Sequence, residues 1–296
     1  MNLYWSDEYI ITAEAFDTTR KSGWIIESLR SSPIDRINIL CPAPLSREQL
    51  ALVHDPRYIQ AVQNGHPRSL ASSQGFRWDP GLWSMACAHT SGMVAAAQDA
   101  WRNRTNAGSL SSGQHHAGHD YGAGFCTFNG IALAAKTVLQ AGAERVLIID
   151  LDAHCGGGTW SLIAGNNQVR QLDIAVNPFD SYAPHWLSTF DYIERARDYL
   201  PTLEKRLNNL TAGNTHFDIC IYYAGMDPYE QCYIGGLPGI TLDLLRKREE
   251  MVFDWCKVQE IPVAFGIGGG YINPQFPDKE LVALHRLTLS ADPRNK

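Results

Sequence analysis

Several features that mark whole classes of protein are missing from this sequence. It has no apolar stretch of the roughly 18 residues that a membrane-spanning helix needs, and no basic start followed by an apolar core, so we expect neither a spanning helix nor a secretory signal. Lys and Arg form no stripe, and the formal net charge is −6, so we expect no direct nucleic-acid partner. No Ser/Pro/Gly-rich linker, charge block or internal repeat divides the chain.

Cysteine is present, but its spacing matches no metal-binding or disulfide pattern. The seven cysteines show no CxxC spacing, and their number is odd. Both facts argue against a disulfide framework or a zinc ribbon and favour a reducing compartment, so we expect a cytoplasmic location. The cysteines are Cys41, Cys87, Cys126, Cys155, Cys220, Cys232 and Cys256.

The apolar residues that are present form two kinds of segment. Short apolar runs typical of strands alternate with longer periodic segments typical of helices. We expect strands near residues 37–40, 145–150, 171–176, 217–223 and 262–267, and helices near residues 47–53, 57–63, 81–102, 127–141, 193–207 and 242–258. This rhythm predicts an α/β fold, a single domain over residues 1–296 with a mainly parallel central sheet and helices on both faces.

The most informative stretch is Asp150-Leu151-Asp152-Ala153-His154, directly after the apolar run 145–149. The run is typical of a buried parallel strand, and open α/β sheets bind ligands at the carboxyl ends of their strands. Because side chains alternate along an extended strand, we expect Asp150, Asp152 and His154 to point the same way. Carboxylates and an imidazole at this position suit zinc or ferrous iron. From this motif alone, a second interpretation stays open, in which the aspartates cap a helix and the histidine is an ordinary loop residue.

Three further clusters lie where the pattern predicts strand ends or loops. The pair His115-His116 in a glycine-rich segment suits a general base with an electrostatic helper, or a surface pair. Asp227 follows an apolar run and is either a third metal ligand or a turn residue before Pro228. Tyr271 follows glycines that lack the GxGxxG spacing of a dinucleotide fold. Its hydroxyl could face a developing oxyanion, or the ring could simply cover the edge of the sheet.

The order of these motifs resembles the zinc-dependent histone deacetylase family within the arginase/deacetylase superfamily. His-His, Gly-Phe-Cys, DxDxH with glycines, Gly-x-Asp and a glycine-rich loop ending in Tyr follow one another over roughly residues 111–271. The resemblance implies an arginase/deacetylase-like fold and a metal-dependent amidohydrolase. Such an enzyme removes acetyl or short acyl groups from lysine side-chain amides by attack of a metal-bound water.

The resemblance also implies roles for individual residues. One zinc ion, with ferrous iron as the alternative, would be held by Asp152, His154 and Asp227. The implied catalytic residues are His116 as general base, His115 as electrostatic partner, Asp150 orienting His115, and Tyr271 as oxyanion donor.

Further implied residues surround the substrate and a second ion. Gly124 and Phe125 would line a narrow tunnel around an aliphatic chain, and Gly269 would also contact the substrate. The backbone of residues 150–154 could hold a structural potassium ion, with an oxygen from Asn177. The implied partners are an acylated lysine peptide or protein, or a small acylated amine.

The sequence departs from the family pattern just after the ligand histidine. The family usually has a second histidine there, then Gly and Asp or Asn, whereas residues 155–158 read Cys-Gly-Gly-Gly. Gly157 therefore stands where the family has the side chain that orients the general-base histidine. His116 either lacks that carboxylate or takes one from elsewhere in the chain.

A second departure affects the pocket. Residues 177–186 replace the family's Pro-Gly-Thr-Gly loop, and Tyr182 or Trp186 could supply the second wall of the tunnel. Lysine deacetylation therefore competes with three further functions: deacetylation of acetylated polyamines or other small amides, a two-metal ureohydrolase, and a catalytically silent binding module. The ureohydrolase needs a second set of aspartates, which the glycines after His154 do not supply.

Overall fold

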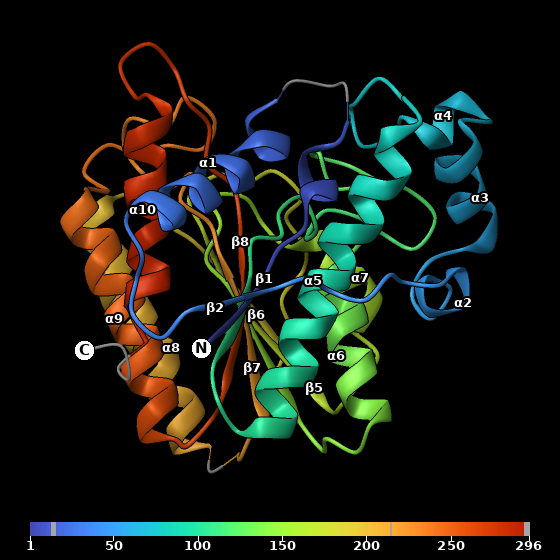
Figure 1. Cartoon of the computed structure of the whole chain (residues 1–296). Coiled ribbons are helices and arrows are strands. Elements are labelled where there is room, and N and C mark those ends of the chain that lie inside the picture. Colours follow the sequence, from blue (N-terminus) through green and yellow to red (C-terminus); the bar gives the residue numbers. More distant parts are fainter. Residues whose placement is uncertain (13–15, 214, 293–296) are drawn as a thin grey trace.

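The core of the fold is a single parallel β-sheet. The computed structural model describes residues 1–12, 16–213 and 215–292. Eight strands are ordered β2-β1-β3-β8-β7-β4-β5-β6, and every pairing between neighbours is parallel (Figure 1). The strands are β1 Asn2–Tyr4, β2 Asn38–Leu40, β3 Ala107–Ser109, β4 Val146–Asp150, β5 Val169–Ala175, β6 Ser188–Tyr192, β7 Ile219–Ala224 and β8 Val263–Ile267. The predicted α/β fold with a central parallel sheet is confirmed.

Helices cover both faces of this sheet, as Figure 1 shows. On one face α5 packs against α6, and α6 against α7, while on the other α1 packs against α10, α10 against α9, and α9 against α8. The helices are α1 Asp17–Ser31, α2 Arg47–Leu50, α3 Pro56–Asn64, α4 Arg68–Ala71, α5 Gly81–Asn103, α6 Gly130–Gln140, α7 Gly157–Ile163, α8 Tyr199–Ala212, α9 Leu242–Val258 and α10 Asp278–Ser290, with short 3-10 helices at Asp7–Ile10 and Ala196–Asp198.

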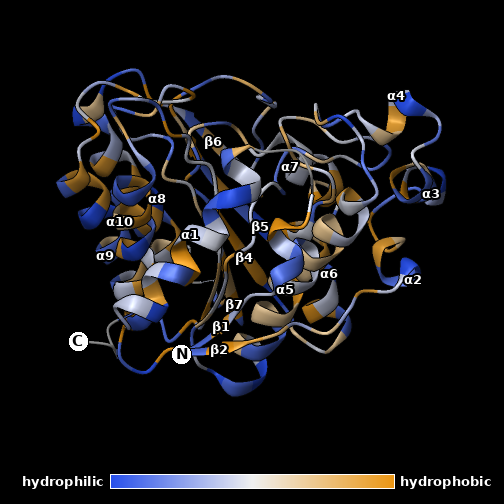
Figure 2. Cartoon of the chain, turned by 45° about the horizontal axis from the view of Figure 1, so that its top comes forward, coloured by the Kyte–Doolittle hydropathy of each residue, from blue (hydrophilic) through white to orange (hydrophobic). Residues whose placement is uncertain are grey.

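The central strands are apolar along their whole length because both of their faces are covered. Successive side chains of β4 enter different cores: Leu147 and Ile149 pack on the α8–α10 side, and Val146 and Ile148 on the α5–α6 side. Figure 2 shows the same division, with hydrophobic strands inside and hydrophilic residues on the outer faces of the helices.

The sequence pattern did not predict the strands β1, β3 and β6 or the helices α1, α4, α7 and α10. β1 and β3 have three residues each, too few for an apolar run to stand out, and β6 is only partly buried. Helix α1 contains a polar first half that nonetheless packs inward, with Lys21 and Ser22 fully buried. Helix α9, in contrast, has the bounds that the periodicity predicts.

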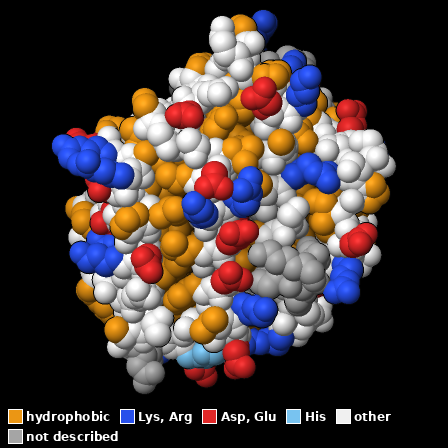
Figure 3. Space-filling model, turned by 90° about the vertical axis from the view of Figure 1, so that its left-hand side faces the viewer, with side chains coloured by type: hydrophobic (Ala, Val, Ile, Leu, Met, Phe, Trp, Pro, Cys, Tyr) orange, Lys and Arg blue, Asp and Glu red, His pale blue; other side chains and the backbone are white. Residues whose placement is uncertain are grey.

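The helices, the surface charges and the cysteines can each be compared with what the composition predicts. Among the described residues, no helix combines the length and the apolar character needed to cross a bilayer. On the face shown in Figure 3, acidic and basic side chains are interspersed, so this face carries no large patch of one sign. All seven cysteines are free thiols.

Candidate active site

The candidate site lies at the carboxyl ends of β4, β7 and β8, next to one another at the centre of the sheet. Strand β4 ends at Asp150, and the chain then turns before helix α7 begins at Gly157. Leu151 and Ala153 pack with Leu147 and Ile149 in the core on the α8–α10 side, whereas Asp150 and Asp152 both contact the His115 imidazole, at 2.9 Å from Nδ1 and 3.6 Å from Nε2. The turn carries Asp152 and His154 toward the end of β7.

Three buried side chains converge at this edge of the sheet. Ligand atoms of Asp152, His154 and Asp227 all lie within 4.8 Å of one another. His154 Nδ1 is 3.1 Å from Asp152 Oδ1 and 3.1 Å from Asp227 Oδ2. Burial lowers the pKa of His154, but its close contacts with the two carboxylates outweigh burial and raise that pKa to about 10. The same nitrogen thus attracts whichever cation is present, a proton or a metal ion.

The residues around this cluster fit a divalent metal ion. Buried Asp227 Oδ2 makes no well-aligned hydrogen bond within the described chain, and its one close partner there is His154 Nδ1, an ion-pair contact at 3.1 Å. A buried carboxylate oxygen without a hydrogen bond is costly, and a bound cation would offset that cost. The backbone fixes the other oxygens: Gly269 N donates to Asp152 Oδ2 at 2.5 Å, and Ala153 N donates to Asp227 Oδ1 at 3.0 Å. Two carboxylates and one imidazole nitrogen form a donor set that zinc accepts, with one position left for a water or substrate.

Gly269 contacts the carboxylates of this cluster and does not line the pocket. A Cβ at this position would lie 2.0 Å from Asp227 Oδ2, so only glycine fits there. It was predicted to contact the substrate, but it is not among the residues that line the neighbouring cavity. Its observed contribution is the backbone N–H that it donates to Asp152.

The predicted histidine pair lies beside the metal-type cluster, and each imidazole contacts a carboxylate. His115 Nδ1 is 2.9 Å from Asp150 Oδ2, and His116 Nδ1 is 2.8 Å from Asp180 Oδ2. The two rings are 3.9 Å apart between centroids. Burial lowers the pKa of both imidazoles, and for His116 burial and the neighbouring His115 together lower it to about 4. Both rings are therefore neutral at neutral pH.

Asp180 is the functional candidate that motif spacing did not identify. The departure at Gly157 indicated that His116 lacks a carboxylate or takes one from elsewhere, and the structure shows the second arrangement. One signal was present: Asp180 is the only acidic residue between residues 177 and 186, the segment that departs from the family pattern.

A cavity of about 380 Å³ opens above the cluster. This volume falls within the range typical of small-molecule sites. Gly124 and Phe125, both predicted to contact the substrate, are among its lining residues. A Cβ at Gly124 would lie 2.3 Å from His116 Cδ2, which explains the glycine. The cavity is lined by His116, Gly124, Phe125, His154, Asn177, Phe179, Ile234 and Tyr271.

The second wall comes from Phe179, not from the residues we expected. Its ring meets the rings of His116 and His154 edge-on, at centroid distances of 4.9 Å and 6.1 Å. Tyr182 instead stacks on Trp160 at 5.2 Å, and Trp186 is 72% exposed, so neither lines the cavity. The prediction that Tyr182 or Trp186 forms the wall is wrong.

Two further side chains complete the surroundings. Tyr271 lines the cavity, and burial, reinforced by the charges of Asp227 and Asp152, raises its pKa well above the usual value, so its hydroxyl stays protonated. Lys21, which the sequence did not indicate, is fully buried and donates to the carbonyl of Gly268. Burial lowers the pKa of Lys21 to about 8, although the carboxylates of Asp227 and Asp152 oppose that shift.

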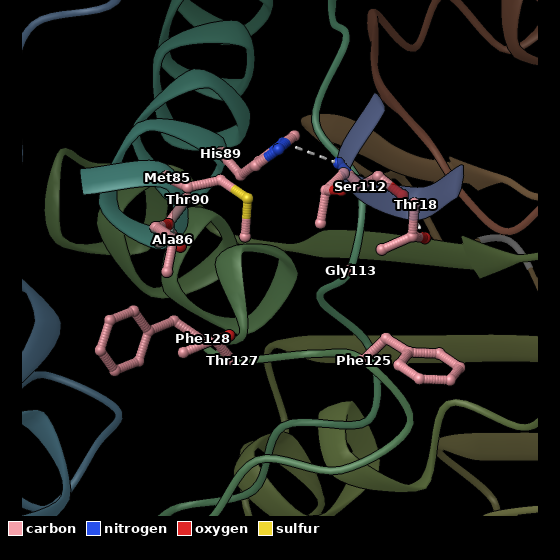
Figure 4. Close-up of a pocket in the computed structure, with 11 residues that line it drawn as sticks. Thr18, Met85, Ala86, His89, Thr90, Ser112, Gly113, Phe125, Thr127 and Phe128 are labelled. Atoms are coloured by element: carbon pink, nitrogen blue, oxygen red, sulfur yellow. Dashed lines mark hydrogen bonds between the residues drawn. The ribbon is translucent and has the colours of Figure 1, made fainter. Parts of the chain in front are cut away.

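A second, much smaller cavity lies on the α5 side of Phe125, which lines both cavities (Figure 4). Its volume of about 10 Å³ has room for roughly one water molecule. Side chains from α1, α5 and two loops surround it, and Ser112 N donates to His89 Nδ1 across one side at 3.1 Å. This cavity is too small to accept a substrate.

Comparison with known proteins shows the family of this chain. The model of the histone deacetylase domain matches residues 16–186, more than half of the chain. This chain belongs to the histone deacetylase family. Within the family, it is 31% identical over 237 residues to an uncharacterized protein of Picosynechococcus, a match that covers 76% of each protein.

Two relatives with descriptive names match over shorter lengths. Histone deacetylase 2 of Arabidopsis thaliana is 31% identical over 171 residues, which cover 55% of this chain and 44% of that protein. Acetylpolyamine amidohydrolase of Mycoplana ramosa is 24% identical over 206 residues, covering 58% of this chain and 60% of that protein. The chain thus spans about half the length of these named relatives. Family membership supports hydrolase chemistry and leaves the substrate open.

Solved structures show the same fold over the full chain. An acetylpolyamine aminohydrolase from Burkholderia pseudomallei superposes with a TM-score of 0.81 at 16% identity, covering 99% of this chain and 98% of that one. The HDA15 HD domain superposes with a TM-score of 0.79 at 18% identity, covering 100% and 93%. At these identities the likeness concerns the fold alone, and it confirms the predicted deacetylase-like architecture.

Proposed function

We propose that this chain is a zinc-dependent deacetylase that hydrolyses the amide bond between an acetyl or short acyl group and a lysine side chain. The observation that carries this proposal is that the candidate metal ligands and the candidate catalytic side chains meet at one cavity. The buried cluster of Asp152, His154 and Asp227 lies beside His116 and Tyr271, and both of the latter line the cavity of about 380 Å³. We further propose that residues 1–296 act as one catalytic domain in the cytoplasm.

Zinc, or ferrous iron in its place, would be held by Asp152, His154 and Asp227. When bound, the ion would polarise the amide carbonyl and lower the pKa of a water molecule to about 7. The backbone N–H groups of Gly269 and Ala153 hold the two carboxylates in place for it.

Proton transfer falls to His116. Its Nδ1 is engaged by a carboxylate, while the ring borders the cavity, so Nε2 is the nitrogen available to the reaction. A neutral imidazole can take a proton from the attacking water and return it to the leaving amine, which contributes about 10²–10⁴-fold in comparable enzymes. His115, paired with Asp150, would stabilise the charge that develops next to it.

Tyr271 would stabilise the oxyanion. Because its hydroxyl stays protonated, it can donate a hydrogen bond to the carbonyl oxygen as negative charge develops there. Phe125 and Phe179 would hold the aliphatic part of the substrate between them, since both rings line the cavity.

An acetylated polyamine is the second candidate substrate. The Mycoplana relative and the Burkholderia structure both carry names of that activity, and an aliphatic chain ending in an acylated amine fits the same aromatic walls. A ureohydrolase and a silent binding module have less support. Within the described residues a single three-residue cluster could hold a metal, whereas a ureohydrolase needs two ions, and the carboxylate on His116 removes the main reason to expect a silent module.

The test is zinc-dependent acetate release. Protein stripped of metal and refilled with zinc should release acetate from acetyl-lysine peptides or from acetylputrescine, and the preferred substrate decides between the two candidates. Tyr271→Phe should lower turnover by about 10²–10³-fold while zinc stays stoichiometric. No release from either substrate by fully zinc-loaded protein would contradict the proposal.

A potassium site remains a further part of the proposal. The backbone of residues 150–154 would supply its ligands, and Asn177 Oδ1, which accepts from Phe179 N at 3.0 Å, keeps a second lone pair for the ion.

A further inference from the structure

The carboxylate of Asp180 is held from two sides. Its Oδ2 atom lies 2.8 Å from His116 Nδ1 and accepts from Gly158 N at 2.9 Å. The Asp180 side chain is only 22% exposed, and the His116 side chain is 4% exposed, so this contact is shielded from most of the solvent. Shielded hydrogen bonds of this kind fix the orientation of an imidazole and the nitrogen that carries its proton.

Gly157 leaves the space in which Asp180 sits. A Cβ at position 157 would lie 2.2 Å from the Asp180 backbone oxygen and 2.5 Å from Asp180 Oδ1. Such distances are far below van der Waals contact, so any side chain at 157 would displace Asp180. The present position of Asp180 therefore requires glycine at position 157.

Local turns place Asp180 at that spot. Its backbone is left-handed, with φ of 59°, a conformation that Asp and Asn tolerate better than other side chains. The preceding residue, Phe179, is fixed at both ends: its N–H donates to Asn177 Oδ1 at 3.0 Å, and its carbonyl accepts from Cys155 N at 3.0 Å. The loop is thus tied both to itself and to the turn that carries His154.

We propose that Asp180 is the positioning residue of His116. Position 157 has no carboxylate to orient this imidazole, and Asp180 supplies one from a different loop. This inference deepens the proposed function and rests on it for the role of His116. The neighbouring Phe179 forms the cavity wall, so one loop both orients the base and shapes the substrate site. Two adjacent residues of this loop should then affect different kinetic constants.

The first test is Asp180→Asn in the zinc-loaded enzyme. Asn keeps the shape and suits the left-handed backbone, so the variant removes mainly the negative charge. We expect kcat to fall by about 10–100-fold, with KM within roughly threefold and zinc stoichiometric. Phe179→Ala is the matched variant on the same loop, and its main effect should be a higher KM. An Asp180→Asn enzyme with unchanged kcat, or one altered only in KM, would overturn the proposal.

The second test moves the carboxylate. Asp180→Gly should show the same loss of kcat, and the added Gly157→Asp substitution should recover at least part of it, because the glycine at 180 frees the loop to make room. A purely structural role for Asp180 predicts no recovery from a second substitution that crowds the loop.

A third measurement does not depend on turnover. The His116 Nδ1–H proton in the zinc-loaded wild type should give a downfield NMR signal typical of a hydrogen bond to a carboxylate, assigned by its loss in His116→Gln. The signal should move upfield or vanish in Asp180→Asn. If the wild type releases no acetate but this signal behaves as expected, the proposed function fails and the positioning contact stands. An unchanged signal refutes the contact itself.

Discussion

His54 and His116 are both buried, and burial holds the pKa of each imidazole at about 4, yet their surroundings differ. In His54 both nitrogens are used by the backbone: Nδ1 donates to the carbonyl of Gly118 at 2.9 Å, and Nε2 accepts from Asn129 N at 2.9 Å. In His116 the Nδ1 atom faces a carboxylate, and no hydrogen bond of Nε2 is found within the described part of the chain.

The comparison separates a structural histidine from one that we propose to be catalytic. Burial and a depressed pKa are common to both, so neither property identifies a base. The distinguishing features are a charged partner on one nitrogen and a cavity beside the other. His54 instead ties the start of helix α6 to a neighbouring loop, since Asn129 is the N-cap of that helix.

The largest effect should follow from His116→Gln. Loss of the base should lower kcat by about 10²–10⁴-fold. The free energy of unfolding should change by no more than about 1 kcal/mol, because only one hydrogen bond is lost. Steady-state kinetics and urea unfolding at neutral pH, with zinc content as the control, measure both quantities. A kcat within tenfold of the wild type would contradict the role of His116 as the general base and leave it a structural residue, like His54.

His54→Leu should give the opposite pattern. It leaves Asn129 N–H and the Gly118 carbonyl without their partner inside the protein, at about 1–3 kcal/mol for each group. We expect the free energy of unfolding to fall by about 2–6 kcal/mol, while kcat per folded molecule stays within about twofold. A large loss of kcat in correctly folded His54→Leu would break the comparison.

The smallest effect concerns pH. The folded-state pKa of His54, about 4, lies below the value of about 6.5 in the unfolded chain. Between these values the unfolded state binds more protons, so His54 destabilises the fold progressively as pH falls from about 6.5 toward 4. The wild type should therefore lose stability more steeply than His54→Leu, by about 1 kcal/mol per pH unit between pH 6 and 5. Parallel slopes of unfolding free energy against pH would contradict the shift.

The sequence predicted the parts of the site that lie at strand ends. The apolar run before Asp150 marks a buried strand, and the carboxyl ends of neighbouring parallel strands meet at one edge of the sheet. Asp152, His154 and Asp227 could therefore be grouped without coordinates, and the structure brings them together. The same reasoning found the central strands and the long helices, whose periodicity spans enough residues to be recognised.

Residues placed by loops and by a polar helix could not be found in that way. Asp180 reaches His116 only because a left-handed residue turns the loop back, and the spacing of polar residues along the chain does not encode such a turn. Phe179 was passed over in favour of Tyr182 and Trp186 for the same reason. Lys21 is a charged side chain in a polar segment, which ordinarily lies on the surface, but helix α1 buries it beneath the glycine loop.

The empty space at Gly157 also bears on how such a site can change by successive substitutions. A carboxylate at 157 and the present position of Asp180 exclude one another, since a Cβ at 157 would overlap the Asp180 backbone. A lineage that moved the carboxylate from one loop to the other through single changes would pass through an ancestor with both side chains crowded together or with neither. If Asp180 has the role proposed for it, either intermediate would be less active than both end points, so the two arrangements are not connected by single changes without loss.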